Sequence, residues 1–361
     1  MERLLFVDPF APVTDPNRWY QPKYSLVNKL KKLIDESGIL EIISPGDIVA
    51  VKTHFGDFGT TRTLRSVFVR TVVEKVIEAG GRPFVTETTG LGLTRDRSTA
   101  YGRLKIAETN GYTQQTVGAP IIIADGLLGF DYVKVGVDGK YLKEVCVAKA
   151  IAEADAVICC THFKLHMQSG IGGSIKNVGV GCVAKPSKFD VHVADYPSIN
   201  ENCTKCDKCV EVCPGGAIEN YRVVRERCLK CLGCDEVCDY DAVNVSWLTG
   251  KDVSDRIVEC AKGVLRVNDN FAYINFLIDV TPHCDCHPFS DVPVVRDIGI
   301  LAGRDIVAID AASVELYERE SKIGELPEDR YWSWTDPHGM LSYAEELGLG
   351  SRNYEIERLE V

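Results

Sequence analysis

The sequence has no hydrophobic run long enough to cross a membrane. Its longest mostly apolar stretches, such as residues 121–124 and 154–160, fall far short of the roughly 20 residues that a spanning helix needs. Near the N-terminus, Asp8 follows too soon to leave room for the apolar core of a signal peptide. We therefore predict a cytoplasmic protein without a membrane partner.

The chain also lacks an excess of positive charge. Its 361 residues include 41 Lys and Arg against 52 Asp and Glu, which gives a formal net charge of −11. Because binding to a phosphate backbone needs a cationic face, this balance disfavours nucleic acid as a partner. The hydrophobic fraction of 45% and the charged fraction of 26% are typical of a globular protein with one large domain or two smaller ones.

Cysteine, in contrast, is abundant, with 15 residues in the chain. In a small secreted protein this number would indicate a disulfide framework. Here no export signal is present, and eight of the cysteines have the spacing of metal ligands. A reducing compartment and thiolate ligands are therefore the better interpretation.

The eight cysteines form two runs of the pattern Cys-x-x-Cys-x-x-Cys-x-x-x-Cys. The first run holds Cys203, Cys206, Cys209 and Cys213, and the second holds Cys228, Cys231, Cys234 and Cys238. In two-cluster ferredoxins the fourth cysteine of each run ligates the other cluster. The spacing thus predicts two 4Fe–4S clusters, one on Cys203, Cys206, Cys209 and Cys238 and one on Cys228, Cys231, Cys234 and Cys213. A zinc ribbon, with two separated Cys-x-x-Cys pairs, fits this spacing less well.

Strand-like and helix-like segments alternate on both sides of the cysteine runs. Strands are expected at residues 4–7, 48–52, 83–86, 120–124, 156–160, 271–280 and 305–309, and helices at 25–34, 69–77, 143–154 and 311–320, the last capped by Asp310. Such alternation favours parallel β–α–β units. We expect an α/β, Rossmann-like domain with a mostly parallel sheet, formed by residues 1–198 and 250–361. Residues 199–249 would be an inserted α+β ferredoxin-like domain that carries the two 4Fe–4S clusters.

Polar motifs follow three of the predicted strands, where α/β folds place their chemistry. These motifs contain Lys52 and His54, then His162, Lys164 and His166, and finally Cys284 and Cys286. We expect the three strand ends to converge on one crevice. Alternation in the second motif would put its three side chains on one face of an extended segment.

The Cys284-x-Cys286 motif has a histidine on each side and is rich in soft and borderline ligands. It could hold an additional metal ion, act as a redox thiol pair, or consist of two buried reduced thiols. The pattern alone leaves all three open.

A glycine-rich run follows the second motif. Gly172 and Gly173 could let backbone N–H groups approach a phosphate, such as that of FMN, with Lys176 and Asn177 nearby. A tightly packed glycine turn is the plain alternative. The letters Gly179-x-Gly181-x-x-Ala184 match a dinucleotide fingerprint, but Lys185-Pro186 is expected to stop the helix that this fingerprint requires.

Motifs along nearly the whole chain resemble the iron–sulfur proteins of domain-of-unknown-function family 362. The motifs are residues 51–56, 124–127, 162–164 with His166, 172–177, 181–182, the cysteine runs, 284–286, 297–301 and 307–310. The resemblance implies the α/β architecture and the clusters, but no reaction.

Together these observations predict an oxidoreductase that passes low-potential electrons from the two clusters to the crevice. We expect catalytic roles for His54, His162, Lys164, His166, Cys284 and Cys286, and binding of a cofactor or small anionic substrate by Lys52, Gly172, Gly173, Lys176 and Asn177. Two alternatives are a non-enzymatic electron-transfer module that docks a redox partner protein, and a flavin-containing reductase.

Overall fold

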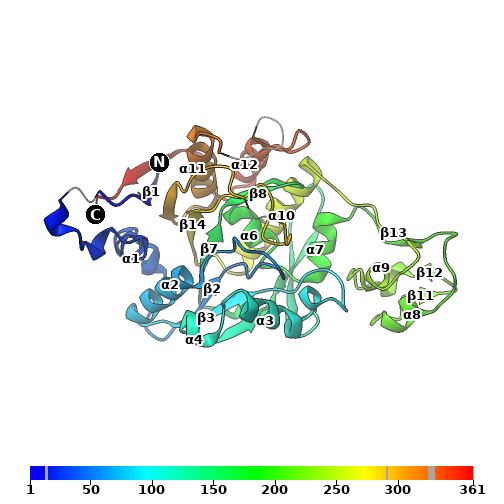
Figure 1. Cartoon of the computed structure of the whole chain (residues 1–361). Helices are drawn as coiled ribbons and strands as arrows, with labels where there is room; N and C mark the ends of the chain where they lie inside the picture. Colours follow the sequence, from blue (N-terminus) through cyan, green and yellow to red (C-terminus); the bar gives the residue numbers. More distant parts are fainter. Residues whose placement is uncertain (13–14, 290–291, 324–329, 361) are drawn as a thin grey trace.

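The computed structural model describes residues 1–12, 15–289, 292–323 and 330–360 (Figure 1). Its centre is an eight-stranded sheet with the order β16-β1-β15-β14-β7-β2-β3-β4. The strands are β1 (Glu2–Val7), β2 (Ile48–Lys52), β3 (Arg82–Glu87), β4 (Ile121–Ile123), β7 (Ala156–His162), β14 (Phe271–Leu277), β15 (Gly299–Gly303) and β16 (Tyr354–Arg358). Every pairing is parallel except those of β15 with β1 and β14. The predicted α/β class with a mostly parallel sheet is confirmed.

Helices cover both faces of this sheet (Figure 1). The helices α1 (Leu26–Glu36) and α2 (Ser66–Glu78) share a core with Val51 and Ile158, whereas α10 (Lys251–Val267) and α11 (Ile306–Arg319) share a second core with Cys159. Successive residues of a strand point to opposite faces, so strands buried on both faces are apolar throughout. This explains the short continuous apolar runs in the sequence.

The strand order creates a switch point at the middle of the sheet. From β2 the chain adds β3 and β4 on one side, and it later adds β7 and β14 on the other side of β2. Open α/β sheets bind ligands beyond the carboxyl ends of their strands at such a point. Here those ends are Lys52 of β2 and His162 of β7.

Two predicted elements are wrong. Residues 305–309 are not a strand but the start of α11, whose first turn is capped by Asp305 through hydrogen bonds from Val307 N and Ala308 N, both 2.8 Å. This turn is apolar because it is buried, which short-range periodicity cannot distinguish from a buried strand. Similarly, the predicted helix at 143–154 is limited to α5 (Lys149–Glu153).

The stretch before α5 forms β6 (Glu144–Ala148), which pairs with β5 (Tyr132–Gly136) in a hairpin. The expectation that Lys185-Pro186 stops a helix is also wrong, because α7 (Lys185–His192) begins there. Pro186 lies in the first turn, where its missing N–H has no intrahelical acceptor to lose.

The remaining elements are short. In the sheet domain they include α3 (Ala100–Thr109), α4 (Gln114–Val117), β8 (Lys164–His166), β9 (Gly170–Gly172), α6 (Ser174–Gly179) and α12 (Pro337–Glu346). The described residues contain no helix with both the length and the apolar character that a membrane span requires.

A small lobe, residues 198–244, projects from one side of the sheet domain (Figure 1). It consists of β10 (Ser198–Ile199), α8 (Lys208–Val212), β11 (Ile218–Glu219), β12 (Arg222–Val223), α9 (Gly233–Glu236) and β13 (Val243–Asn244). Pairing of β10 with β13 brings the two ends of the lobe together. The lobe lies almost entirely within the predicted insert, residues 199–249.

Candidate functional site

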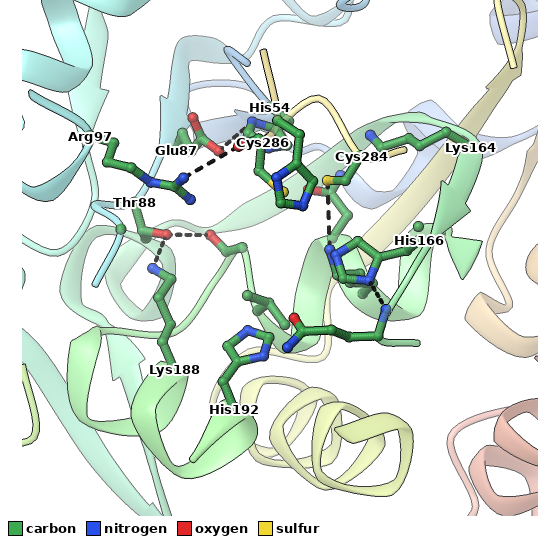
Figure 2. A pocket seen from close by; sticks show the side chains of 18 of the residues that line it. His54, Glu87, Thr88, Arg97, Lys164, His166, Lys188, His192, Cys284 and Cys286 are labelled. Carbon is green, nitrogen blue, oxygen red and sulfur yellow. Dashed lines mark hydrogen bonds and ion pairs between the residues drawn. The ribbon is translucent and has the colours of Figure 1, made fainter. Parts of the chain in front are cut away.

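A pocket of about 540 Å³ opens at the carboxyl ends of the central strands (Figure 2). All eleven candidate residues outside the lobe lie on its wall, although they come from separate parts of the chain. They are Lys52, His54, His162, Lys164, His166, Gly172, Gly173, Lys176, Asn177, Cys284 and Cys286. The parallel strands bring these residues together because their carboxyl ends meet at one edge of the sheet.

Cys284 is the centre of the pocket's ionisable groups. Its sulfur is hydrogen-bonded by Cys286, His166 and His54, and Lys176 Nζ lies 3.7 Å away. The hydrogen bond from Cys286 and the charge of Lys176, together with the two imidazoles, outweigh burial and hold the pKa of Cys284 well below its usual value. The pKa of Cys286 is raised by the same contact and by burial. The contact between the two thiols therefore shifts their pKa values in opposite directions.

A buried acid orients His54. Its Nδ1 lies 2.9 Å from Glu87 Oε1, and Arg103 Nη2 lies 3.4 Å from the same oxygen. Burial alone would raise the pKa of Glu87, but the charges of Arg103 and His54 lower it. Burial opposes protonation of His54, yet Glu87 and the Cys284 sulfur raise its pKa. Glu87, His54 and Cys284 thus form a continuous chain of polar contacts.

Asp285 anchors the segment that carries the two cysteines. Its carboxylate is fully buried, with His162 Nδ1 3.0 Å from both oxygens and Lys164 Nζ 3.0 Å from Oδ2. These two cations outweigh burial and lower the pKa of Asp285 to about 2. Residues 284–287 form a turn closed by a hydrogen bond from His287 N to Cys284 O (2.9 Å), and in this turn Cys284 and Cys286 line the pocket while Asp285 is buried away from it. His162 and Lys164 therefore position the motif.

The N–H groups that follow the glycine run, at the start of α6, already have an acceptor. Asp310 accepts hydrogen bonds from Ser174 N (2.7 Å) and Ile175 N (2.8 Å), so a carboxylate already occupies the start of α6. A Cβ on Gly173 would lie 2.5 Å from both oxygens of Asp310. This corrects one prediction, because Asp310 caps α6 instead of a helix at 311–320. It also leaves the N–H groups of Ser174 and Ile175, next to Gly172 and Gly173, occupied by a carboxylate.

Two of the predicted binding residues contact each other. Lys52 Nζ donates to Asn177 Oδ1 (2.8 Å) and to Thr53 O (2.7 Å). Lys176 is different, because its ammonium faces the Cys284 sulfur. Lys52 and Asn177 thus build the wall, while Lys176 contributes charge to the cavity.

Sequence reasoning missed several residues of this pocket. Glu87 directly ends a correctly placed strand and could have been found by the rule applied to the other strand ends. Lys188 and His192 lie one turn apart on α7, which the sequence had excluded as a helix. Burial lowers the pKa of Lys188 to about 7 despite Asp125, and burial together with the charge of Lys176 lowers that of His192 to about 3.

The pocket is strongly basic in an acidic protein. Of the described residues that line it, seven are basic and Glu87 alone is acidic; the basic ones are Lys52, Arg95, Arg97, Arg103, Lys164, Lys176 and Lys188. Five of the seven are paired with carboxylates, namely Arg95 with Glu236, Arg97 with Asp57, Arg103 with Glu87, Lys164 with Asp285 and Lys188 with Asp125. The positive charge that favours an anionic ligand therefore comes mainly from Lys176.

The cysteines of the lobe surround two small cavities. One is lined by Cys203, Cys206, Cys209 and Cys238, and the other by Cys213, Cys228, Cys231 and Cys234. The fourth cysteine of each run thus lies with the first three of the other run. Cys206 is exposed, whereas Cys231 is buried, so the first cavity lies nearer to solvent.

The two cysteine loops share their backbone conformation. Lys205 and Asp207 have φ of 59° and 64°, and the matching residues Lys230 and Leu232 have φ of 57° and 62°. Each loop is followed by an N–H that donates to a sulfur, from Ala217 to Cys213 (3.2 Å) and from Ala242 to Cys238 (3.3 Å). Left-handed residues are uncommon outside glycine, so their repetition at equal offsets marks a duplicated unit.

The cavity around Cys231 adjoins the pocket. Phe189 of α7 lines this cavity, while Lys188 and His192 of the same helix line the pocket. Leu91, also on the pocket wall, packs into a small apolar cluster with Phe189, and Gly92 N next to it donates to Cys231 O at 2.7 Å. One helix thus lines both sites, and one loop on the pocket wall contacts Cys231 of the cavity.

One group of side chains could hold a single metal ion. In the described part of the chain, one ligand nitrogen of His166 and the sulfurs of Cys284 and Cys286 all lie within 4.8 Å of one another. Imidazole and thiolate suit zinc and other transition metals of intermediate softness. The geometry thus offers a candidate metal site on the pocket wall.

Comparison with known proteins gives one family match. The model of a family described as "Domain of unknown function (DUF362)" matches residues 49–315. A thylakoid-associated protein of Synechocystis sp. is 28% identical over 175 residues, which cover 47% of this chain, and the chain spans about half (50%) of that relative's length. The lactate racemase apoprotein from Thermoanaerobacterium thermosaccharolyticum is 14% identical over 71% of this chain and 49% of its own, with a TM-score of 0.36, too low to support an argument.

Proposed function

Because the chain belongs to the DUF362 family, a domain of unknown function, we propose its activity from its own site. We propose an oxidoreductase that holds two 4Fe–4S clusters in the lobe and delivers electrons to a small anionic substrate in the pocket. The observation that carries this proposal is the shared wall, in which α7 and Leu91 separate the cavity around Cys231 from the pocket.

The lobe cysteines suit clusters better than single ions. A zinc ion binds thiolate sulfur at about 2.3 Å, so two of its sulfur ligands lie at most about 4.6 Å apart. Within the described residues, no cysteine of the lobe belongs to a group of three or more ligand atoms within 4.8 Å of one another. Four sulfurs spread more widely around one cavity leave room for a cube of iron and sulfide.

The chain's own groups tune the clusters it would hold. When bound, the clusters supply one-electron transfer. The N–H groups of Ala217 and Ala242 donate to cysteine sulfurs, and such hydrogen bonds are one of the factors that set cluster potential. The exposed first cavity, with Cys206 at its edge, is the side on which a redox partner protein would dock.

In the pocket, the same reasoning assigns roles to basic and proton-carrying residues. Lys176 and Arg97 lie on the wall and would hold an anionic substrate. His54, oriented by Glu87 at 2.9 Å, is placed to give or take a proton at its other ring nitrogen. A flavin reductase has less support, because Asp310 occupies the N–H groups of Ser174 and Ile175, next to the glycines proposed for its phosphate.

The first test is a count of iron and sulfide in protein purified without oxygen. We expect about eight of each per chain, and about four irons in both Cys206→Ser and Cys231→Ser. Cys146→Ser, which changes a buried cysteine outside the lobe, is the matched control and should keep about eight. Zinc in place of iron would contradict the proposal.

The second test is the reoxidation of chemically reduced protein by a panel of small organic and inorganic anions. An acceptor that uses the pocket should react more slowly with Lys176→Ala and His54→Ala, while their iron content is unchanged. Equal rates for every acceptor in all three proteins would instead favour the non-enzymatic electron-transfer module.

A further inference from the structure

We propose that His166, Cys284 and Cys286 bind one divalent transition-metal ion of the zinc or iron(II) class, with an open coordination position toward the pocket. The proposal deepens the proposed function, because this ion would be the reaction centre. The site itself shares no ligand with the lobe, so it can be tested separately.

The distances and donor types fit such an ion. A nitrogen bound at about 2.0–2.1 Å and a sulfur bound at about 2.3 Å of one ion lie at most about 4.4 Å apart, and two sulfurs at most about 4.6 Å. The three ligand atoms all lie within 4.8 Å of one another, so small rotations of the side chains close the site. Two thiolates and an imidazole suit zinc, iron and their neighbours, whereas magnesium and calcium require oxygen ligands.

The protein holds both thiols in place before any ion binds. Asp285, between them, is fully buried and fixed by His162 and Lys164 at 3.0 Å. Partners behind the ligands orient a metal site and are nearly as important as the ligands themselves. The anchored Asp285 therefore explains why His162 and Lys164 adjoin the pocket without pointing at its contents.

The ring of His166 also has a suitable partner. Ser169 Oγ donates its proton to Ile171 O (3.0 Å), so it can accept one from His166 Nδ1 at 3.2 Å. With the proton on Nδ1, the other ring nitrogen keeps a free lone pair for a metal. The backbone N–H groups of Gln168 and Ser169 also point at Nδ1 (3.1 and 3.3 Å) and favour the opposite tautomer without metal. A metal on the other ring nitrogen would therefore shift His166 to the tautomer that Ser169 Oγ supports.

The fourth position of a tetrahedral ion would face the cavity. His54 contacts the Cys284 sulfur from the pocket wall but is not part of the three-ligand group within the described residues (Figure 2). Three protein ligands with one open position are typical of catalytic sites, and four protein ligands of structural ones. The basic wall around the opening favours an anionic ligand for the ion.

The test uses zinc, because its X-ray absorption edge is separate from that of iron. Full-length protein is freed of loosely bound metal with a mild chelator and dialysed against Zn²⁺. We expect one zinc per chain, unchanged iron, and a zinc shell of about two sulfurs at about 2.3 Å with nitrogen or oxygen at about 2.0 Å.

Variants locate that zinc. Cys284→Ser, Cys286→Ser and His166→Ala should each weaken zinc binding at least about 100-fold. Substituting a residue that only orients a metal ligand typically weakens metal binding by about 10- to 100-fold, so a larger loss identifies a ligand. The matched controls are Cys146→Ser, a buried cysteine elsewhere, and His287→Ala, a histidine of the same segment outside the group. Both controls should bind zinc as the unmodified protein does.

Three results would overturn the inference: zinc retained in Cys284→Ser, a zinc shell of four sulfurs, or a Cys284–Cys286 disulfide in the zinc-treated protein by differential alkylation and mass spectrometry. The outcome also separates the two proposals. Zinc at this site in a protein without clusters would refute the proposed electron delivery alone. Eight irons without this zinc would refute only the metal site.

Discussion

At the scale of single residues, the Cys-x-Cys motif depends on an acid that never reaches the pocket. Asp285 is fully buried, and its partners His162 and Lys164 are 4% exposed each, so neither cation can turn to water if the carboxylate is lost. A buried charge without its partner is strongly destabilising. In the sequence this acid is simply the residue between the two cysteines, and only its contacts in the structure reveal its role.

We therefore expect Asp285→Asn to lower the free energy of unfolding by about 3–5 kcal/mol, measured by urea denaturation. The control is Asp138→Asn, whose side chain is 96% exposed and lies 3.4 Å from Arg266. It should change stability by less than about 0.5 kcal/mol. Similar effects of the two substitutions would show that the buried anchor has no special importance.

His192 gives a prediction about pH. Its pKa is lowered to about 3 by burial and by Lys176, whereas an unfolded histidine has a pKa of about 6.5. Between these values the unfolded state binds a proton that the folded state does not, so stability falls as the pH falls through this window. Its contribution should amount to about 2 kcal/mol between pH 7 and pH 5.

Urea denaturation at several pH values, compared with His192→Gln, measures this contribution. The variant should lose less stability than the unmodified protein between pH 7 and pH 5. Parallel curves for the two proteins would mean that His192 titrates in the folded state near its ordinary pKa.

At the scale of elements, the packing of α11 against α6 closes off the glycine run. The carboxylate that satisfies the first N–H groups of α6 comes from Asp310, 135 residues further along the chain. Gly173 is needed where this carboxylate approaches, because no side-chain carbon fits between them. The glycine run resembles a ligand-binding loop in sequence, but in the structure Gly173 allows α11 to approach the start of α6 closely.

Gly173→Ala should destabilise the protein by about 1–3 kcal/mol, since its Cβ would displace the Asp310 carboxylate. Hydrogen exchange should locate the damage at the amides of Ser174 and Ile175. The control is Gly136→Ala on β5, where the nearest atom to an added Cβ is 4.0 Å away. Unchanged protection of both amides in Gly173→Ala would contradict the capping role of Asp310.

At the scale of the whole molecule, Glu236 fastens the lobe to the sheet domain. Its carboxylate accepts hydrogen bonds from Leu93 N (2.6 Å), Thr94 N (2.5 Å) and Arg95 N (3.0 Å), and from the Ser98 hydroxyl (3.0 Å). The loop it holds is the one that contacts Cys231 and carries Leu91. One side chain therefore maintains the short path between lobe and pocket.

Glu236→Ala should increase hydrogen exchange in residues 91–98 and in the lobe, while the strands of the large sheet keep their protection. Peptide-resolved exchange measured by mass spectrometry tests this. Glu211→Ala, an exposed substitution on α8, is the control and should leave residues 91–98 unchanged. The same exchange pattern in both variants would show that other contacts hold the lobe.

The sequence by itself determined much of the central sheet and most of the pocket wall. Strands such as β2, β3 and β7 are apolar over a few consecutive residues, and the chemistry follows each strand end, so both can be inferred from short-range patterns. Seven of the eleven candidate residues were found in this way, and the other four came from the glycine-rich run. The duplicated cysteine spacing is equally local, which is why it predicts two groups of ligands.

Only the tertiary structure decided how distant segments meet. It turned the predicted strand at 305–309 into a helix, placed β16 beside β1, and brought Glu87 to His54 and Asp285 to His162. A buried helix turn and a buried strand have the same composition, and a carboxylate's partner depends on which strands are neighbours. Spacing along the chain therefore predicts neither whether a buried apolar segment is a helix or a strand nor which side chain a buried carboxylate will contact. Both depend on how distant segments pack in the folded protein.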